Sequence, residues 1–198
     1  MEEGKHIIQT GAIQAKVDEL TAQGKKVYWP RRESTIDLDV IAYVEVGVEI
    51  ARQCQAQNIA PEYLYLAALD TTQAGVALGL TYLESPITVR GFCPLPNIDD
   101  RHQDMANLAN QAARRLGLDT ELSATDFDND DTFVGEGYGL PSPEGLNALR
   151  TLARTEGILL DPVYTSKALA GLLAHVADGR LNGDNPALFA YAEDVLAE

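Results

Sequence analysis

The sequence predicts an α/β protein, a three-layer sandwich in which a mainly parallel sheet is flanked by helices. An apolar content of 45% with 23% charged residues is typical of a folded chain that has a core. Along the chain, hydrophobic spacing switches repeatedly between the helical period and the short apolar runs of buried strands. The expected order of elements is αβαβαβααα, which favours parallel strands joined by helical crossovers.

The first half of the chain alternates helices with strands. Residues 7–23 show helical spacing that ends at Gly24, and residues 26–29 are predicted as a short strand that stops at Pro30. A helix is expected at about 39–57, with its apolar residues on one face. The next elements are the buried strand 63–67, a helix at 72–83, a strand at 87–92 and a helix at about 100–116.

The second half is predicted to be mainly helical. Residues 126–131 are interpreted as a loop, because nothing apolar recurs there and like charges crowd together. Ser142-Pro143-Glu144 carries the residue types that begin a helix, and Asp161-Pro162 repeats the signal for a helix at 163–177. Asn185-Pro186 predicts a last helix to about Leu196. We expect one α/β domain over residues 1–198.

Charge and composition exclude several classes of function. The formal charge of −15 repels phosphate backbones and anionic lipids, so we expect neither nucleic acid nor a membrane surface as a partner. No apolar run is long enough to span a bilayer, and the acidic start does not resemble a secretory signal. We expect a cytoplasmic protein in which Cys54 and Cys93 are buried thiols.

No metal site is predicted. Asp126, Asp128 and Asp130 have the alternate spacing that opens a calcium loop, but the glycine and glutamate that such a loop requires are replaced by Asp131 and Gly137. The three histidines, His6, His102 and His175, are scattered without partners at ligand spacing.

The junction between the strand 63–67 and its helix is the most informative site. Ligands of open α/β sheets bind at the carboxyl ends of strands, where free amides at a helix N-terminus attract anions. No glycine lies between Ala67 and Thr72 to let the backbone approach a phosphate. Asp70 is expected to cap the helix with its own carboxylate, so the anion site is filled from within the chain.

Two runs, Glu136–Gly145 and Leu152–Ala168, resemble D-cysteine desulfhydrase and 1-aminocyclopropane-1-carboxylate deaminase. Shorter matches are Ala42–Glu45, Thr72–Gly75 and Pro186–Ala192. The resemblance implies a pyridoxal-phosphate lyase fold, the tryptophan synthase β-like fold type II, in truncated form. It covers the C-terminal part of a family member, so residues 1–58 would be a remnant of the small domain and 59–198 a remnant of the large domain.

The resemblance implies vestigial site residues. Tyr164 matches the tyrosine beside the cofactor, and Thr165 the position where the deaminases carry glutamate; helix initiation and core packing also account for that run. The phosphate loop aligns with Ala67–Thr72, where glycines have become Ala, Asp and Thr, which leaves Thr71, Thr72 and Gln73 as degenerate cofactor-binding candidates. Tyr138, in its glycine turn, is interpreted as a packing residue.

Other parts of the family pattern have no counterpart. The Schiff-base lysine lies in a segment N-terminal to the match, and Lys167 is not its equivalent. The small-domain Gly-Gly-Ser-Asn stretch aligns near residues 33–36. The last sheet strand, with its His-Thr-Gly-Gly, is missing before Pro186, so neighbouring strands would be exposed unless another chain or a rearranged strand order covers them.

These departures predict a degenerate homologue that acts through protein contacts. No cofactor is expected for this chain alone, although pyridoxal 5'-phosphate is implied by the resemblance. The expected partner is a second copy or a companion subunit that supplies the N-terminal half. The alternatives are a subunit of a split lyase of the desulfhydrase or deaminase type, and a binding protein that takes a cationic small molecule in the old cleft.

Overall fold

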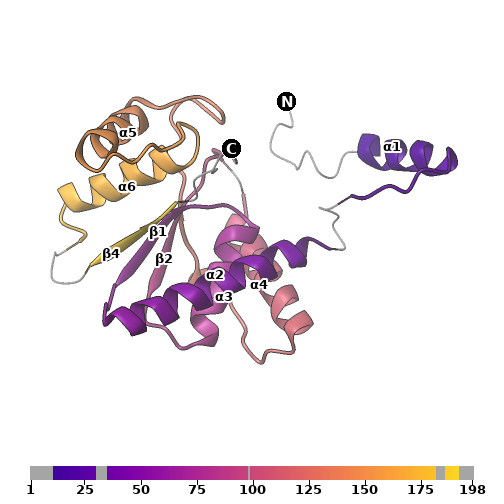
Figure 1. Ribbon diagram of the computed structural model, residues 1–198, viewed down its shortest axis with the longest axis horizontal. Coiled ribbons are helices and arrows are strands. Elements are labelled where there is room, and N and C mark those ends of the chain that lie inside the picture. Colours follow the sequence, from indigo (N-terminus) through magenta and orange to yellow (C-terminus); the bar gives the residue numbers. More distant parts are fainter. Residues whose placement is uncertain (1–10, 30–34, 98, 182–185, 192–198) are drawn as a thin grey trace.

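A parallel sheet forms the middle layer of the computed structural model, which describes residues 11–29, 35–97, 99–181 and 186–191 (Figure 1). Within these residues the sheet has four strands in the order β3-β2-β1-β4, and every neighbouring pair is parallel. The strands are β1 (Tyr63–Ala67), β2 (Thr88–Phe92), β3 (Asp128–Asp130) and β4 (Ala187–Ala190). The prediction of an α/β sandwich is confirmed.

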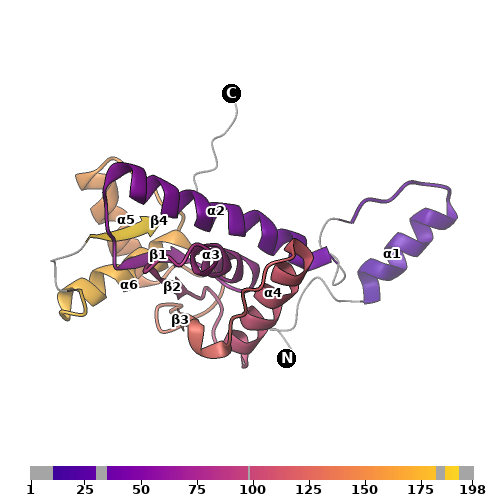
Figure 2. The same ribbon diagram turned by 90° about the horizontal axis from the view of Figure 1, so that it is seen from below.

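Helices cover both faces of this sheet (Figure 2). One layer consists of α2 (Ile36–Gln57), α3 (Thr71–Tyr82) and α4 (Arg101–Leu116), and the other of α5 (Pro143–Thr155) and α6 (Thr165–Ala177). Because side chains alternate along a strand, Leu64 and Leu66 of β1 enter the core under α2–α4, whereas Tyr65 packs with Phe92 and Ala168 under α6. The short 3-10 helix η2 (Ala124–Asp126) precedes β3.

Helix α1 (Gly11–Ala22) stands apart from this body and contains no buried residue (Figures 1 and 2). The segment after it does not form the predicted strand, since residues 25–29 adopt no regular structure and Tyr28 is 86% exposed. The prediction of a strand at 26–29 is therefore wrong. A strand needs a neighbour for its backbone groups, and no described strand lies beside this segment.

The acidic run also differs from its prediction as a loop. Asp128–Asp130 forms β3, which pairs with Arg90–Phe92 of β2. The side chain of Arg90 explains why charged residues are tolerated there, because its Nε lies 2.8 Å from a carboxylate oxygen of Asp128. Asn129 points inward and is buried, whereas its two neighbours are more exposed. Side-chain burial therefore alternates along β3, as expected for a strand with one buried face.

The C-terminal helix predicted from Pro186 to Leu196 is wrong where it can be compared. Residues 187–190 form β4, paired with Tyr63–Leu66 of β1, and residues 192–196 lie outside the described part. The family's His-Thr-Gly-Gly is absent from the sequence, but β4 lies beside β1 and covers that side of it. Backbone groups of β1 on this side need partners, and an uncharged apolar segment satisfies them. The alignment near residues 33 and 34 also falls outside the described residues, as does His6.

Candidate functional site

The candidate site lies at the carboxyl end of β1, where the chain turns into α3. Asp70 is the N-cap residue of α3, and its carboxylate accepts a hydrogen bond from the backbone N–H of Thr71. The predicted cap is confirmed. Asp70 adopts a φ of +46°, a conformation that favours glycine and is disfavoured for a residue with a Cβ. A negatively charged side chain therefore occupies the position at which a helix N-terminus would receive an anion.

The three cofactor-binding candidates after Asp70 are turned toward the protein. Thr71 is buried, Thr72 is half-buried, and Gln73 has no exposed surface. The side chain of Gln73 donates to the carbonyl of Asp128 over 2.8 Å and accepts from Asn129 Nδ2 over 2.7 Å. Gln73 thus ties α3 to β3, and its amide is committed to the fold.

Asn129 completes this buried amide pair and was missed by the sequence analysis. Its Nδ2 also donates to the carbonyl of Ala68 over 3.0 Å, which holds the residue that follows β1. A Cβ at Gly91 would lie 2.0 Å from Gln73 Oε1, so only glycine fits beside the pair. In the sequence, the feature that could have indicated its role is that Asn129 is an uncharged amide within an acidic run.

Tyr164 and Tyr138 form a surface pair at the start of α6. Their hydroxyl groups contact one another and their rings meet edge to face, with centroids 6.0 Å apart. The side chains are 42% and 51% exposed, respectively. Tyr138 thus packs against Tyr164, in keeping with its interpretation as a packing residue, and each of the two hydroxyls is engaged by the other.

Thr165 is bound by the cap of its own helix. Asp161 accepts from the backbone N–H of Thr165 over 2.9 Å and from its Oγ1 over 2.5 Å. Burial alone would raise the pKa of Asp161, but hydrogen bonds from Thr165, Tyr164 and Val163 lower it below its usual value. The Thr165 hydroxyl is therefore a structural group, and of the two predicted catalytic positions Tyr164 is the accessible one.

Lys167 anchors the glycine turn that carries Tyr138. Its buried Nζ donates to the carbonyl of Val134 over 2.7 Å and to that of Gly137 over 3.2 Å. Burial lowers the pKa of Lys167, and the nearby Asp161 partly opposes this shift. Two charge-assisted bonds to backbone hold this amine within the protein.

Replacing Tyr138 with phenylalanine is expected to lower the pKa of Tyr164, which contact with the Tyr138 hydroxyl and burial raise to about 12. A raised phenol pKa stabilises the fold below the unfolded value near 10 and loses this contribution as the pH rises through about 12. NMR titration of ring-labelled tyrosine measures the shift, with Tyr82→Phe as the control. An unchanged Tyr164 titration in Tyr138→Phe would contradict the contact.

Other features of the described residues do not add a ligand site. They contain no group of three or more side chains suited to holding a metal ion, and no helix among them could cross a membrane. In the acidic run, Asp128 pairs with Arg90 and Asp126 accepts from the N–H of Ser123. Cys54 and Cys93 are free and buried, as predicted, and burial raises the pKa of Cys93.

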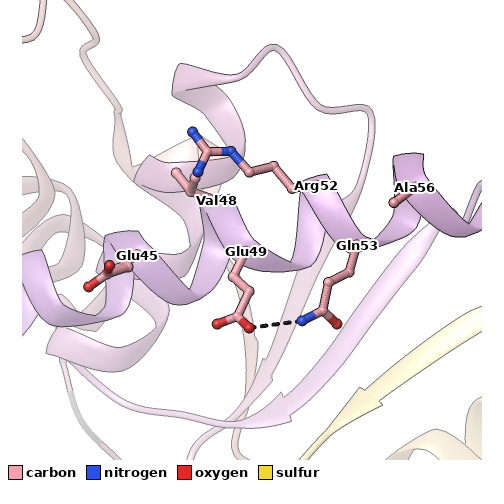
Figure 3. Close-up of a pocket in the computed structure, with 6 residues that line it drawn as sticks. All are labelled: Glu45, Val48, Glu49, Arg52, Gln53 and Ala56. Carbon is pink, nitrogen blue, oxygen red and sulfur yellow. Dashed lines mark hydrogen bonds between the residues drawn. The ribbon is translucent and has the colours of Figure 1, made fainter.

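An open groove runs along the outer side of α2, away from this site (Figure 3). Its only internal contact drawn is the hydrogen bond from Gln53 Nε2 to Glu49, over 2.8 Å. Every lining residue belongs to the one helix, so the groove does not bring different elements together. Its lining residues are Glu45, Val48, Glu49, Arg52, Gln53 and Ala56.

This chain is similar in sequence and in fold to known proteins. A family model described as pyridoxal-phosphate dependent enzyme matches residues 2–191. A crystal structure of an ACC deaminase homologue is similar to this chain, with a TM-score of 0.77 and 28% sequence identity. The match covers 94% of this chain and 55% of the other. The chain therefore spans about half the length of that protein.

Proposed function

The chain belongs to the family of pyridoxal-phosphate dependent enzymes, and from this premise we propose that it is a degenerate member that no longer catalyses and acts through protein contacts. The observation that carries the proposal is the Asp70 carboxylate at the N-terminus of α3. The family resemblance aligns the phosphate loop with Ala67–Thr72, the segment that leads into this terminus, which supports the proposal. A cytoplasmic location is part of the proposal, since both buried cysteines are free thiols.

The residues at this terminus do not fit the phosphate of the cofactor. A phosphate binds a helix N-terminus through free backbone amides, and the first of these, the N–H of Thr71, is bound by Asp70. A carboxylate about 4 Å from a phosphate opposes it by roughly 4 kcal/mol per unit charge at an effective dielectric constant near 20. A penalty of that size lowers the affinity for the phosphate group about a thousandfold.

The described lysines support the same proposal. The cofactor's usual covalent link requires a lysine amine that reaches it. Lys167 donates to two carbonyl groups from a buried position. Lys16 lies on α1, and Lys25 and Lys26 follow it in the segment that stands apart from the sheet (Figure 1). The Lys167 amine is thus committed to backbone carbonyl groups, and the other three amines lie on the separate segment.

Mixing the purified chain with pyridoxal phosphate tests the proposal. We expect an absorbance spectrum identical to that of free cofactor and, after borohydride reduction, no adduct in the intact mass. A persistent shifted band with a single adduct would overturn it. The Lys167→Arg variant is the matched control, because loss of such an adduct in this variant would identify Lys167 as the site of attachment.

A second candidate is a subunit of a split lyase, of the desulfhydrase or deaminase type. The observation that favours it is the 55% coverage of the ACC deaminase homologue, which leaves a large part of that fold for another polypeptide segment to supply. In this candidate residues 1–58 derive from the small domain and 59–198 from the large one. Co-purification with a polypeptide that carries the remaining segment, together with restored cofactor binding, distinguishes it from the first proposal.

A further inference from the structure

The two edges of the sheet differ in how they are protected against pairing with another strand. The β3 edge is short and carries acidic residues, Asp128 and Asp130, at both of its ends. Asp128 is 50% exposed and pairs with Arg90 beside it. Short length and charge are the devices by which proteins keep an edge strand from recruiting a neighbour. The β3 edge is therefore closed to strand addition.

The β4 edge is also short, at four residues, but it lacks the protecting charges. Its residues are Ala187, Leu188, Phe189 and Ala190, all uncharged and all half-buried, and Figure 1 shows the strand running along one side of the sheet. Among the described strands, β4 pairs only with β1. Strands of a parallel sheet are usually buried on both faces, so partial burial of every residue marks an unfinished edge.

Backbone geometry shows which groups of β4 face outward. The carbonyl of Pro186 accepts from the N–H of Glu62 over 3.3 Å, so it points toward β1. In a trans peptide the next N–H points the opposite way, so the N–H of Ala187 faces away from the sheet. Alternation along the strand then directs the N–H and C=O groups of Ala187 and Phe189 outward. These are the groups to which an added strand would bond.

We propose that the β4 edge binds the β4 edge of a second copy, the two strands pairing antiparallel about a two-fold axis. The pairing is self-complementary, because each copy offers the same outward groups and the axis brings side chains of the same sheet face together. Phe189 and Tyr191, stacked with ring centroids 6.1 Å apart, supply aromatic contacts on one face. This inference rests on the proposed function through protein contacts.

Charge favours this surface over others for self-association. Each copy carries a formal charge of −15, so two copies repel one another wherever acidic residues face across an interface. The segment from Ala187 to Tyr191 carries no charged side chain. We therefore expect the dimer to strengthen as ionic strength rises, since salt screens the repulsion between the two bodies.

Sedimentation velocity across the micromolar range tests the interface with two variants. Ala187→Pro removes one outward N–H at the first residue of an edge strand, a position that tolerates proline. Tyr191→Lys adds a charge beside the strand at a residue that is 38% exposed. Each change is expected to raise the dimer Kd by at least roughly tenfold. Tyr82→Lys, at a 50% exposed tyrosine at the end of α3, is the matched control.

The outcomes separate this inference from the proposed function. A wild-type dimer that both β4 variants weaken and Tyr82→Lys leaves intact supports the β4 interface. A wild-type monomer throughout the range, or a dimer unaffected by Tyr191→Lys when that variant is folded by circular dichroism, overturns it. Cofactor binding is measured separately on the same samples, so an adduct with pyridoxal phosphate would overturn the proposed function without deciding the oligomeric state.

Discussion

Replacing Asp70 with glycine is expected to give the N-terminus of α3 measurable affinity for phosphate. The substitution removes the carboxylate that accepts from the N–H of Thr71, and glycine adopts the φ of +46° without a Cβ penalty. Removing one like charge at about 4 Å is worth up to roughly 4 kcal/mol. Water competes with phosphate for the freed amide, and Thr71 and Thr72 remain in place of the family's glycines, so the gain in binding free energy is smaller than this limit. We therefore expect the affinity for phosphate to rise by at least about tenfold.

Amide NMR titrations with inorganic phosphate and with pyridoxal phosphate measure this gain, with shifts expected at Thr71 and Thr72. Asp70→Ala is the matched control, since it also removes the carboxylate but keeps a Cβ in the disfavoured conformation. Loss of the cap should cost Asp70→Ala about 1–2 kcal/mol of stability, whereas in Asp70→Gly relief of the backbone offsets part of that loss. An Asp70→Gly protein that binds phosphate no better than the wild type would show that the carboxylate is not what excludes the anion.

Local rules were sufficient to predict this junction. The apolar run at 63–67 and the Asp-Thr-Thr sequence after it specify a buried strand followed by a capped helix, and both signals lie within a few residues of one another. The same holds for Ser142-Pro143, where the Ser142 side chain accepts from the N–H of Gly145 as an N-cap should. These two helix starts were therefore placed correctly, whereas the same kind of signal at Asn185-Pro186 precedes strand β4.

Elements that depend on distant partners were not predictable in this way. The strand at 128–130 pairs with β2, where Arg90 lies across from Asp128 and forms an ion pair with it. The strand at 187–190 pairs with β1 on the side that β2 does not occupy. The Tyr138–Tyr164 contact likewise joins residues 26 positions apart. Composition and periodicity describe a segment alone, whereas strand pairing is decided by what the rest of the chain leaves unsatisfied.

Replacing Gly75 with alanine is expected to destabilise the fold by about 3 kcal/mol, the largest stability effect anticipated here. A Cβ at this position would lie 2.3 Å from the carbonyl oxygen of Val40 and 2.5 Å from Cβ of Tyr43, both on α2. The carbonyl is backbone and cannot rotate away, so α2 and α3 would have to separate. Gly47 and Gly79 make similarly close approaches between these helices, and separation would disturb them too.

Urea denaturation of Gly75→Ala measures this cost against Gly11→Ala, the same change at a helical glycine with nothing within 4 Å. The control should be neutral or slightly stabilising, because alanine is the better helix former. Equal midpoints for the two variants would mean that α2 and α3 are not packed this closely. A large loss in Gly75→Ala alone would instead show that close helix contact fixes the position of α3, and with it the place where Asp70 closes the helix N-terminus to anions.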